Sequence, residues 1–144
     1  TRVFRITNSY GPIEQIIPKK NAVNFLINES QKKGSITIFN EGKFFRDLIY
    51  ISDVVSGIRK IIKKGKSGEL YWIASGKKTW FYDLANILRK ETNCEIKYIK
   101  TPVYTKKVDV GNFQVNNFKL KKLGWIPKIT LSDGIKKTID FLDK

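Results

Sequence analysis

Short runs of β-branched and aromatic residues alternate along this chain with longer stretches that carry apolar side chains at helical spacing, and this alternation limits the fold more than any other feature. Strands are predicted over residues 3–7, 35–39, 48–51, 70–74 and 95–99. Helices are predicted over residues 18–33 and 52–64, and from residues 79, 116 and 132 onward. Strands that alternate with helices in this way are typical of the α/β class, and the lack of a repeat or linker indicates one unit over residues 1–144.

The helix predictions also specify caps and buried faces. Four residues whose side-chain oxygens can accept a free backbone N–H are expected as N-caps: Ser52, Thr79, Asn116 and Ser132. One apolar face is expected to form a buried stripe: Val54, Val55, Ile58, Ile61 and Ile62. In the last helix the residues expected to point inward are Ile135, Thr138, Ile139 and Leu142.

The net charge of +15 at pH 7 raises the hypothesis that the chain binds nucleic acid. Lysine carries almost all of the positive charge, and the lysines fall in ones and twos at predicted helix ends and turns. Isoleucine and asparagine are enriched together with lysine, which is typical of a compositional bias over a whole chain. We therefore expect a solvated lysine surface rather than a nucleic-acid partner, and keep a basic nucleic-acid-binding module without catalytic activity as the alternative.

Several kinds of site are excluded by the residue types present. The chain has no histidine and a single cysteine, Cys94, so histidine catalysis, a zinc site and an intrachain disulfide are not expected. A lone thiol favours a reducing, cytoplasmic setting. No apolar run approaches the roughly 20 residues that a membrane helix needs, so no membrane association is expected.

The chain also lacks the loops that usually bind nucleotide phosphates. Gly65-Lys66-Ser67 has the residue types that end a phosphate loop, but Lys60 replaces the required earlier glycine. A helix is predicted before it and a strand after it, the reverse of the required order, so we interpret Gly65 as a helix stop. No G-x-G-x-x-G occurs, and no tyrosine is followed four residues later by lysine, so no catalytic residue is predicted.

Arg46 is one of only five arginines in this lysine-rich chain, and it follows Phe45 directly. A guanidinium donates two parallel hydrogen bonds to a phosphate, which an ammonium group cannot do. The alternative is a structural ion pair with Asp47, Asp53 or another carboxylate. These residues alone leave anion binding and structural pairing equally open.

Several short motifs occur in a fixed order along the chain. They are R-x-x-N-x-Y-G-P at residues 5–12, I-P at 17–18, G-x-x-x-R-D-x-x-Y-x-x-D at 42–53, Y-x-I-A-S-G at 71–76 and L-G-W-x-P-K at 123–128. This series resembles the C-terminal, substrate-binding portion of the extended short-chain dehydrogenase/reductases, the NAD-dependent nucleotide-sugar epimerases and dehydratases. The resemblance implies an α/β fold that includes a piece of the Rossmann sheet.

The resemblance implies roles for individual residues. Asn8 is expected at the diphosphate or sugar, with an Asx turn as the alternative. Residues around Ile17 and Pro18, including Ile16, are expected to line the nucleotide pocket. Thr37 and Phe39 are expected to face the base from one side of a strand, Phe39 stacking on it, with an ordinary core position as the alternative for Phe39. Arg46 is expected to bind the diphosphate, whereas Tyr10, Gly11, Asp53 and Trp125 are expected to be structural.

Two departures from the family pattern affect these expectations. Trp72 stands where an asparagine is usual, and the second phosphate-binding arginine of many members is replaced by Lys106 or Lys107. We assign that role to Lys107.

The resemblance further implies NAD as the cofactor, bound mainly by an N-terminal part that this chain lacks, and a nucleotide sugar as the ligand. That N-terminal part is then an expected partner, and a homo-oligomer is a further expected state. The chain alone is expected to be inactive. A binding protein that never had a catalytic half is a third hypothesis.

Overall fold

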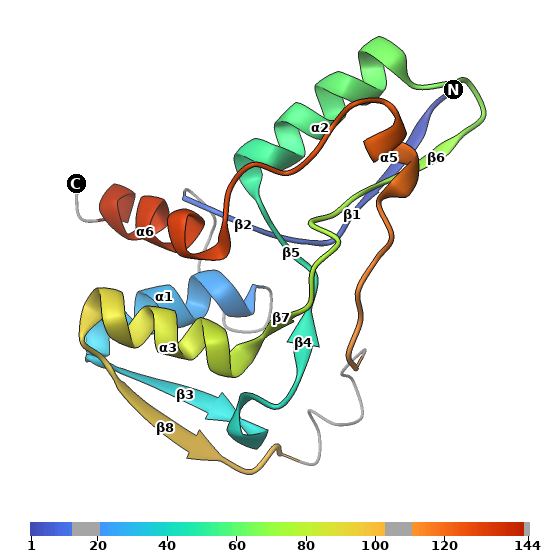
Figure 1. Ribbon diagram of the computed structural model, residues 1–144. Coiled ribbons are helices and arrows are strands. Elements are labelled where there is room, and N and C mark those ends of the chain that lie inside the picture. The colour runs from blue at the N-terminus through green and yellow to red at the C-terminus, as the bar shows by residue number, and fades with distance from the viewer. Residues whose placement is uncertain (13–20, 103–110, 143–144) are drawn as a thin grey trace.

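The structure is a computed structural model, and it describes residues 1–12, 21–102 and 111–142 (Figure 1). The strands are β1 (Val3–Ile6), β2 (Asn8–Tyr10), β3 (Ser35–Phe39), β4 (Phe45–Arg46), β5 (Leu48–Tyr50), β6 (Leu70–Ile73), β7 (Thr79–Trp80) and β8 (Glu95–Ile99). The helices are α1 (Ala22–Lys33), α2 (Ile51–Lys64), α3 (Phe81–Thr92), α5 (Phe118–Lys122) and α6 (Leu131–Leu142), and η1 (Asn40–Gly42) is a short 3-10 turn. The α/β class and all five predicted strands are confirmed. No described helix combines the length and the apolar character needed to cross a membrane.

Most strand pairs are parallel and join segments that are distant in the sequence. β1 pairs with β6, β2 with β5 and β3 with β8, all in parallel, whereas β4 pairs with β7 in antiparallel orientation. In Figure 1, α1 and α3 lie above the β3/β8 pair, while α2 and α5 lie at the other end of the molecule beside β6. The short β4/β7 ribbon lies between these two regions.

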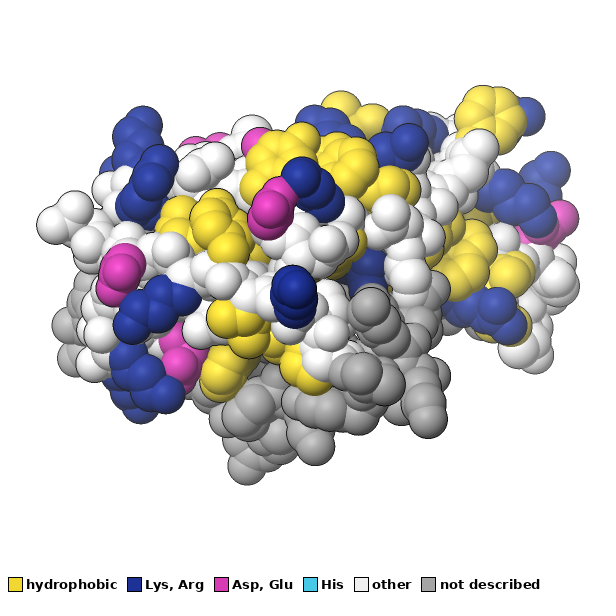
Figure 2. All heavy atoms as spheres, turned by 90° about the horizontal axis from the view of Figure 1, so that it is seen from below, with side chains coloured by type: hydrophobic (Ala, Val, Ile, Leu, Met, Phe, Trp, Pro, Cys, Tyr) yellow, Lys and Arg dark blue, Asp and Glu magenta, His cyan; other side chains and the backbone are white. Residues whose placement is uncertain are grey.

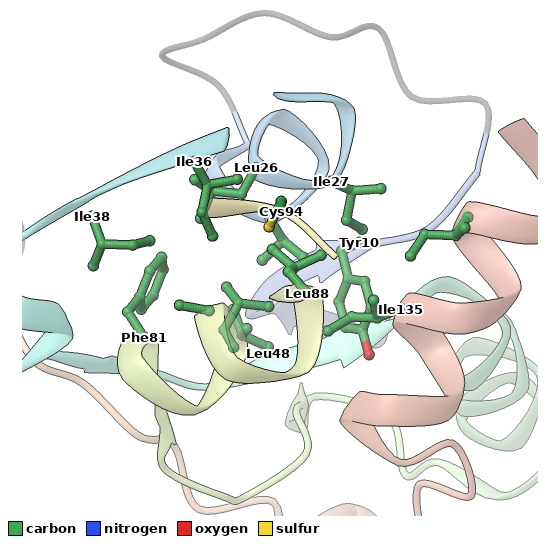
Figure 3. Packing of buried hydrophobic residues seen from close by; sticks show 14 of the residues in the cluster. Tyr10, Leu26, Ile27, Ile36, Ile38, Leu48, Phe81, Leu88, Cys94 and Ile135 are labelled. Carbon is green, nitrogen blue, oxygen red and sulfur yellow. The ribbon is translucent and has the colours of Figure 1, made fainter. Parts of the chain in front are cut away.

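Two apolar clusters form the core, and β5 separates them. Figure 3 shows the larger cluster, in which side chains from β3, α1, α3 and α6 converge around Tyr10 and Leu48. The smaller cluster packs α2 and α5 against β6 through Ile61, Ile73 and Leu120. Leu48 belongs to the larger cluster and its neighbour Ile49 to the smaller one, because successive side chains of a strand point to opposite faces. β5 is thus buried on both faces, as parallel strands usually are.

Three of the four predicted helix caps are wrong. α2 begins at Ile51, directly after β5, so Ser52 lies exposed in the first turn and Tyr50 occupies the N-cap position. Thr79 is a strand residue of β7 and α3 begins two residues later. Thr130 rather than Ser132 accepts the N–H of Asp133 at the start of α6 (3.1 Å). Asn117 occupies the N-cap position of α5, but it is the side chain of Asn116 that accepts the N–H of Phe118 (2.8 Å), as expected of the predicted cap.

The predicted start of the first helix near Pro18 lies outside the described residues. The described helix α1 begins at Ala22, after Asn21, whose side chain accepts the N–H groups of Val23 and Asn24.

The buried stripes of two helices are narrower than expected. Val54 and Ile61 of α2 are buried, but Val55 is 43% exposed and Ile62 is 65% exposed. Leu142, at the end of α6, is 42% exposed. Apolar spacing predicts the direction of a buried face, but the width of that face depends on how much surface the neighbouring elements cover.

Tyr10 holds α6 against the larger cluster. Its ring meets Tyr50 edge to face at 5.5 Å, and its hydroxyl donates to the carbonyl of Leu131 over 3.5 Å. A side chain at Gly134 would place its Cβ 2.3 Å from this hydroxyl, so glycine is required there. Burial raises the pKa of Tyr10 well above its usual value. These contacts confirm the expected structural role of Tyr10.

We predict that Tyr10→Phe changes how stability depends on pH. Because the pKa of Tyr10 is raised in the folded state, its neutral hydroxyl contributes fully to the free energy of unfolding below the unfolded-state pKa of about 10. This contribution is lost as the pH rises above that value. At pH 8 the variant should unfold within about 1 kcal/mol of the parent, because the hydroxyl makes one long hydrogen bond. Above pH 10 the variant should become progressively more stable than the parent in denaturant titrations. Parallel stability curves from pH 8 to 11 would contradict this account.

β1 leaves apolar side chains exposed. The sequence predicts a strand that is buried on both faces, yet Val3 is 48% exposed and Phe4 and Ile6 are each 40% exposed. Among the described strands only β6 pairs with β1. Phe4 and Ile6 lie beside the buried Tyr71 and Ile73 in register, so they extend a face of the sheet that α2 only partly covers.

We therefore predict that the chain binds a hydrophobic dye and associates with itself as its concentration rises. The doubly substituted Phe4→Lys/Ile6→Lys chain should lose most of both properties, because charge on an edge strand opposes pairing. Ile126→Lys is the control, since Ile126 is also exposed, at 62%, but lies in the loop between α5 and α6 and not on a strand. A parent chain that stays monomeric and binds no dye, measured by light scattering and dye fluorescence, would refute this prediction.

Candidate functional site

Arg46 lies in β4 and is almost entirely buried, with 7% of its surface exposed. It stands opposite Thr79 in the antiparallel β4/β7 ribbon. Its Nη1 donates to the carbonyl of Phe45 at 2.9 Å, and its Cζ lies 5.7 Å from the centre of the Phe44 ring. Phe44 stacks on Phe81 with ring centres 4.3 Å apart. Aromatic side chains and the ribbon backbone thus hold the guanidinium in a largely water-excluded place.

Asp47, one of the two carboxylates considered as an ion-pair partner for Arg46, is fully buried. Its Oδ1 accepts the N–H of Ser75 at 2.9 Å and the hydroxyls of Ser75 and Thr7 at 2.7 and 3.5 Å. Its Oδ2 accepts the N–H groups of Gly76 at 3.0 Å and Val115 at 3.3 Å. The carboxylate therefore fastens β4 and β5 to three distant segments.

Asp53, the other carboxylate considered, has a similar structural role at a different place. Its Oδ2 accepts the N–H groups of Lys128 and Ile129 at 3.0 and 2.9 Å, which ties α2 to the loop before α6. Next to it, the indole N–H of Trp125 donates to the hydroxyl of Ser56 at 2.8 Å. The structural roles predicted for Asp53 and Trp125 are confirmed.

Asn8 begins β2 with an exposed side chain. It pairs with Leu48 in register, and the residue before it, Thr7, donates to Asp47. Within the described residues the side chain of Asn8 makes no hydrogen bond, so no Asx turn is seen there. Thr7 directly precedes Asn8, and Asp47 directly follows Arg46. The hydrogen bond from Thr7 to Asp47 therefore connects the two predicted site residues through their neighbours in the chain.

Thr37 and Phe39 lie on the face of β3 that points away from the core. The intervening residues Ile36 and Ile38 are buried at 1% and 2% exposure, whereas Thr37 is exposed and Phe39 is half-buried. Phe39 belongs to neither apolar cluster, which argues against the alternative that it is ordinary core. It stands beside Ile99 of β8, which is 46% exposed.

Three other predicted site residues, Ile17, Pro18 and Lys107, lie outside the described residues, as do Ile16 and Lys106. The described contacts link Asn8 to Arg46 but do not directly link either of them to Thr37 or Phe39.

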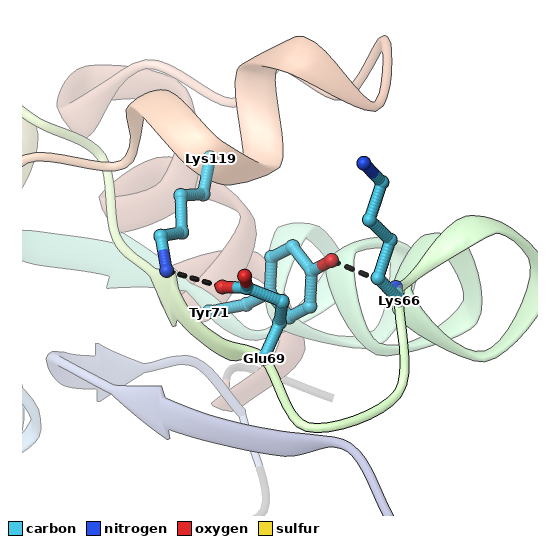
Figure 4. A network of polar contacts seen from close by, with 4 residues as sticks. All are labelled: Lys66, Glu69, Tyr71 and Lys119. Carbon is cyan, nitrogen blue, oxygen red and sulfur yellow. Dashed lines mark hydrogen bonds and ion pairs between the residues drawn. The ribbon is translucent and has the colours of Figure 1, made fainter.

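The segment around Gly65 is a helix stop, as predicted. The N–H of Gly65 donates to the carbonyl of Ile61 at 2.8 Å, and Figure 4 shows the N–H of Lys66 donating to the hydroxyl of Tyr71 (2.8 Å). Beside them, Lys119 pairs with Glu69 and thereby lowers the pKa of Glu69. These backbone donors are used within the protein and do not form a phosphate-binding loop.

Trp72, which replaces the usual asparagine, is half-buried on β6. The guanidinium carbon of Arg5 lies 5.6 Å from the centre of its ring. The substituted position thus packs against β1 and makes a cation–π contact there.

Asp47 is the residue whose importance sequence reasoning missed: it appeared as a possible partner for Arg46 and as the aspartate of the motif at residues 42–53, but no role was assigned to it. Its main donors lie 28 and 29 positions further along the chain. The only local signal is an acidic residue directly before a run that is buried on both faces. Such a residue requires partners, but the sequence does not say which ones.

Comparison with known proteins shows which family the chain resembles. Residues 1–74 match the model of the NAD dependent epimerase/dehydratase family. The human dTDP-D-glucose 4,6-dehydratase is 32% identical over 96% of this chain, which corresponds to 40% of the human protein. A putative UDP-glucose 4-epimerase of Methanocaldococcus jannaschii is 26% identical over 97% of the chain and 45% of that protein.

A solved structure shows the same fold. The UDP-glucose 4-epimerase of Thermotoga maritima, determined with UDP-glucose, superposes with a TM-score of 0.85 at 29% identity over 99% of this chain. The chain covers 45% of that structure, so it spans less than half the length of the relatives that it matches. Because the family model matches more than half of the 144 residues, this chain belongs to the NAD-dependent epimerase/dehydratase family.

Proposed function

We propose that this chain binds the diphosphate and base of a nucleotide sugar for epimerisation or dehydration by a full-length NAD-dependent enzyme, of which it forms the C-terminal, substrate-binding portion. The observation that carries the proposal is the environment of Arg46. Arg46 is 7% exposed, its Cζ lies 5.7 Å from the centre of the Phe44 ring, and its Nη1 donates to the carbonyl of Phe45, so its guanidinium is a pre-oriented cation in low-dielectric surroundings.

The chemistry of a guanidinium suits a diphosphate. Its planar fork donates paired hydrogen bonds to phosphate oxygens, and a low-dielectric surrounding strengthens each of them. The exposed amide of Asn8, on β2, supplies a donor and an acceptor for the diphosphate or sugar. In this proposal Phe39 stacks on the base, beside Thr37, and Ile17, Pro18 and Lys107 complete the pocket.

The reaction itself is assigned to the rest of the enzyme. No G-x-G-x-x-G and no tyrosine–lysine pair at the required spacing occurs in these 144 residues. NAD, the cofactor of the family, supplies hydride transfer when bound. This chain contributes by holding the sugar in a productive orientation, which is catalysis by positioning, and by itself it is inactive.

The basic surface does not require a nucleic-acid function. Figure 2 shows Lys and Arg side chains at separate places on the face seen from below, interspersed with hydrophobic side chains. Some cations also have acidic partners, such as Lys33 with Glu29 at 2.9 Å. A solvated lysine surface accounts for this distribution.

We predict that replacing Arg46 weakens nucleotide binding in two steps. Arg46→Lys keeps the charge but loses the fork, so it should cost on the order of 1–2 kcal/mol in the binding free energy of UDP or dTDP. Arg46→Ala should cost more, because it removes the charge as well. Calorimetric titration measures both changes, after circular dichroism has verified that each variant is folded.

If both variants bind UDP and dTDP as the parent does, Arg46 has only a structural role and the proposal fails. Binding should weaken modestly with added salt, since few charges are involved. Duplex DNA that binds more tightly than either nucleotide, with a steep salt dependence, would instead support the nucleic-acid alternative.

We predict that Phe39→Ala separates base recognition from diphosphate recognition. Loss of stacking should weaken UDP and dTDP by roughly 1–3 kcal/mol and leave inorganic pyrophosphate unaffected. Phe118→Ala is the control, because Phe118 is a solvent-accessible phenylalanine (55% exposed) on α5, where Nζ of Lys122 lies 4.5 Å from the centre of its ring. Equal weakening of pyrophosphate and nucleotides by Phe39→Ala would contradict the assignment of this side chain to the base.

A further inference from the structure

The β4/β7 ribbon that carries Arg46 is too short to be stable by itself. Each strand contributes two residues, with Phe45 opposite Trp80 and Arg46 opposite Thr79. Isolated two-stranded ribbons are marginal in water even when they are longer. Another interaction must therefore hold the two strands together at the end where Arg46 lies.

The carboxylate of Asp47 supplies that interaction. It directly follows β4 and accepts three hydrogen bonds from Ser75 and Gly76, which form the turn that leads into β7. Gly76 has a φ of 74°, and a Cβ there would lie 3.3 Å from the side chain of Asn117. The turn is thus held from one side by Asp47 and from the other by Asn117, whose Nδ2 donates to the carbonyl of Ala74 at 2.7 Å.

The same carboxylate also reaches the strand that carries Asn8. Thr7, the residue before Asn8, donates its hydroxyl to Oδ1 of Asp47, and Val115 donates its N–H to Oδ2. Arg46 is oriented by Phe44 and by the carbonyl of Phe45, so its guanidinium moves with the ribbon. The separation between Asn8 and Arg46 therefore depends on the bonds of Asp47.

We infer that Asp47 is a positioning residue of the proposed nucleotide-diphosphate site: without touching the ligand, its carboxylate holds Asn8 and Arg46 in register to bind one diphosphate. This inference rests on the proposed function and deepens it. Asp47 is fully buried and cannot contact a ligand, so its substitution would change the affinity for the nucleotide only through the positions of Asn8 and Arg46.

Asp47→Asn is the informative substitution. Asparagine has nearly the same volume, so it leaves no cavity, but one carboxylate oxygen becomes an NH₂ group that cannot accept a hydrogen bond. That group then faces N–H or O–H donors, whichever oxygen it replaces. The ribbon and the strand of Asn8 should shift relative to each other while the overall fold is retained.

The test is a double-mutant cycle in UDP binding, measured by calorimetry below the unfolding temperature of every variant. Asp47→Asn should weaken UDP about tenfold or more, since small displacements of a binding group are costly. In the Asp47→Asn background Arg46→Lys should cause a much smaller further loss than in the parent, because the fork is already misplaced.

Asp53→Asn is the matched control, since Asp53 is also buried and also accepts two backbone N–H groups. It should lower the unfolding temperature but change UDP affinity less than about twofold and leave the Arg46→Lys effect intact. If Asp47→Asn does not fold, Ser75→Ala replaces it in the cycle. Ser75→Ala removes the 2.7 Å hydroxyl bond to Asp47, together with the 3.1 Å bond that this hydroxyl accepts from the N–H of Lys77, and should weaken UDP by about two- to fivefold.

The outcomes separate the two proposals. Two results would show that Asp47 is not a positioning residue and would leave the proposed function standing. One is that Asp47→Asn, or Ser75→Ala in its place, binds UDP as the parent does. The other is that Arg46→Lys lowers the UDP affinity as much in that background as it does in the parent. If the parent chain binds neither UDP nor dTDP, the proposed function fails and this inference fails with it.

Discussion

A buried carboxylate determines how the segments of this protein meet. Removing the charge of Asp47 from water is costly, and the cost is offset only when several donors converge on its two oxygens. Here five hydrogen bonds reach it, from Thr7, Ser75, Gly76 and Val115. Each of these donors belongs to a segment far away in the sequence. The need to satisfy one side chain thus brings together the strand of Asn8, the β4/β7 ribbon and the segment before α5.

Arg46 and Asp47 are neighbours, yet their surroundings differ. The carboxylate is surrounded by backbone donors, whereas the guanidinium lies beside the ring of Phe44 and donates to the carbonyl of Phe45. Successive side chains on a strand point in opposite directions. One segment can therefore place a buried, hydrogen-bonded carboxylate on one side and a cation on the other. In the proposed site, the scaffold around Asp47 supports the anion-binding guanidinium without contributing a ligand-binding atom of its own. The relatives that this chain matches are more than twice its length.

Much of the fold could be predicted from the sequence, because apolar periodicity reports which face of an element is buried. It located five of the eight described strands and the amphipathic helices, and it indicated that Thr37 and Phe39 share a face. It failed where local preference and tertiary context disagree: Thr79 and Trp80 belong to a two-residue strand that is too short to leave a periodic signal. The partners of Asp47 and Asp53 could not be predicted, because their donors lie up to 76 positions away. For that reason the sequence alone left anion binding and ion pairing equally open for Arg46.

The central claim is that Arg46 binds the diphosphate of a nucleotide, and a crystal structure of this chain with UDP tests it most directly. The account predicts phosphate oxygens within hydrogen-bond distance of the guanidinium of Arg46, the amide of Asn8 on the same diphosphate, and uracil against Phe39. A nucleotide bound elsewhere, with Arg46 directed at a protein carboxylate and making no contact with phosphate, would contradict it.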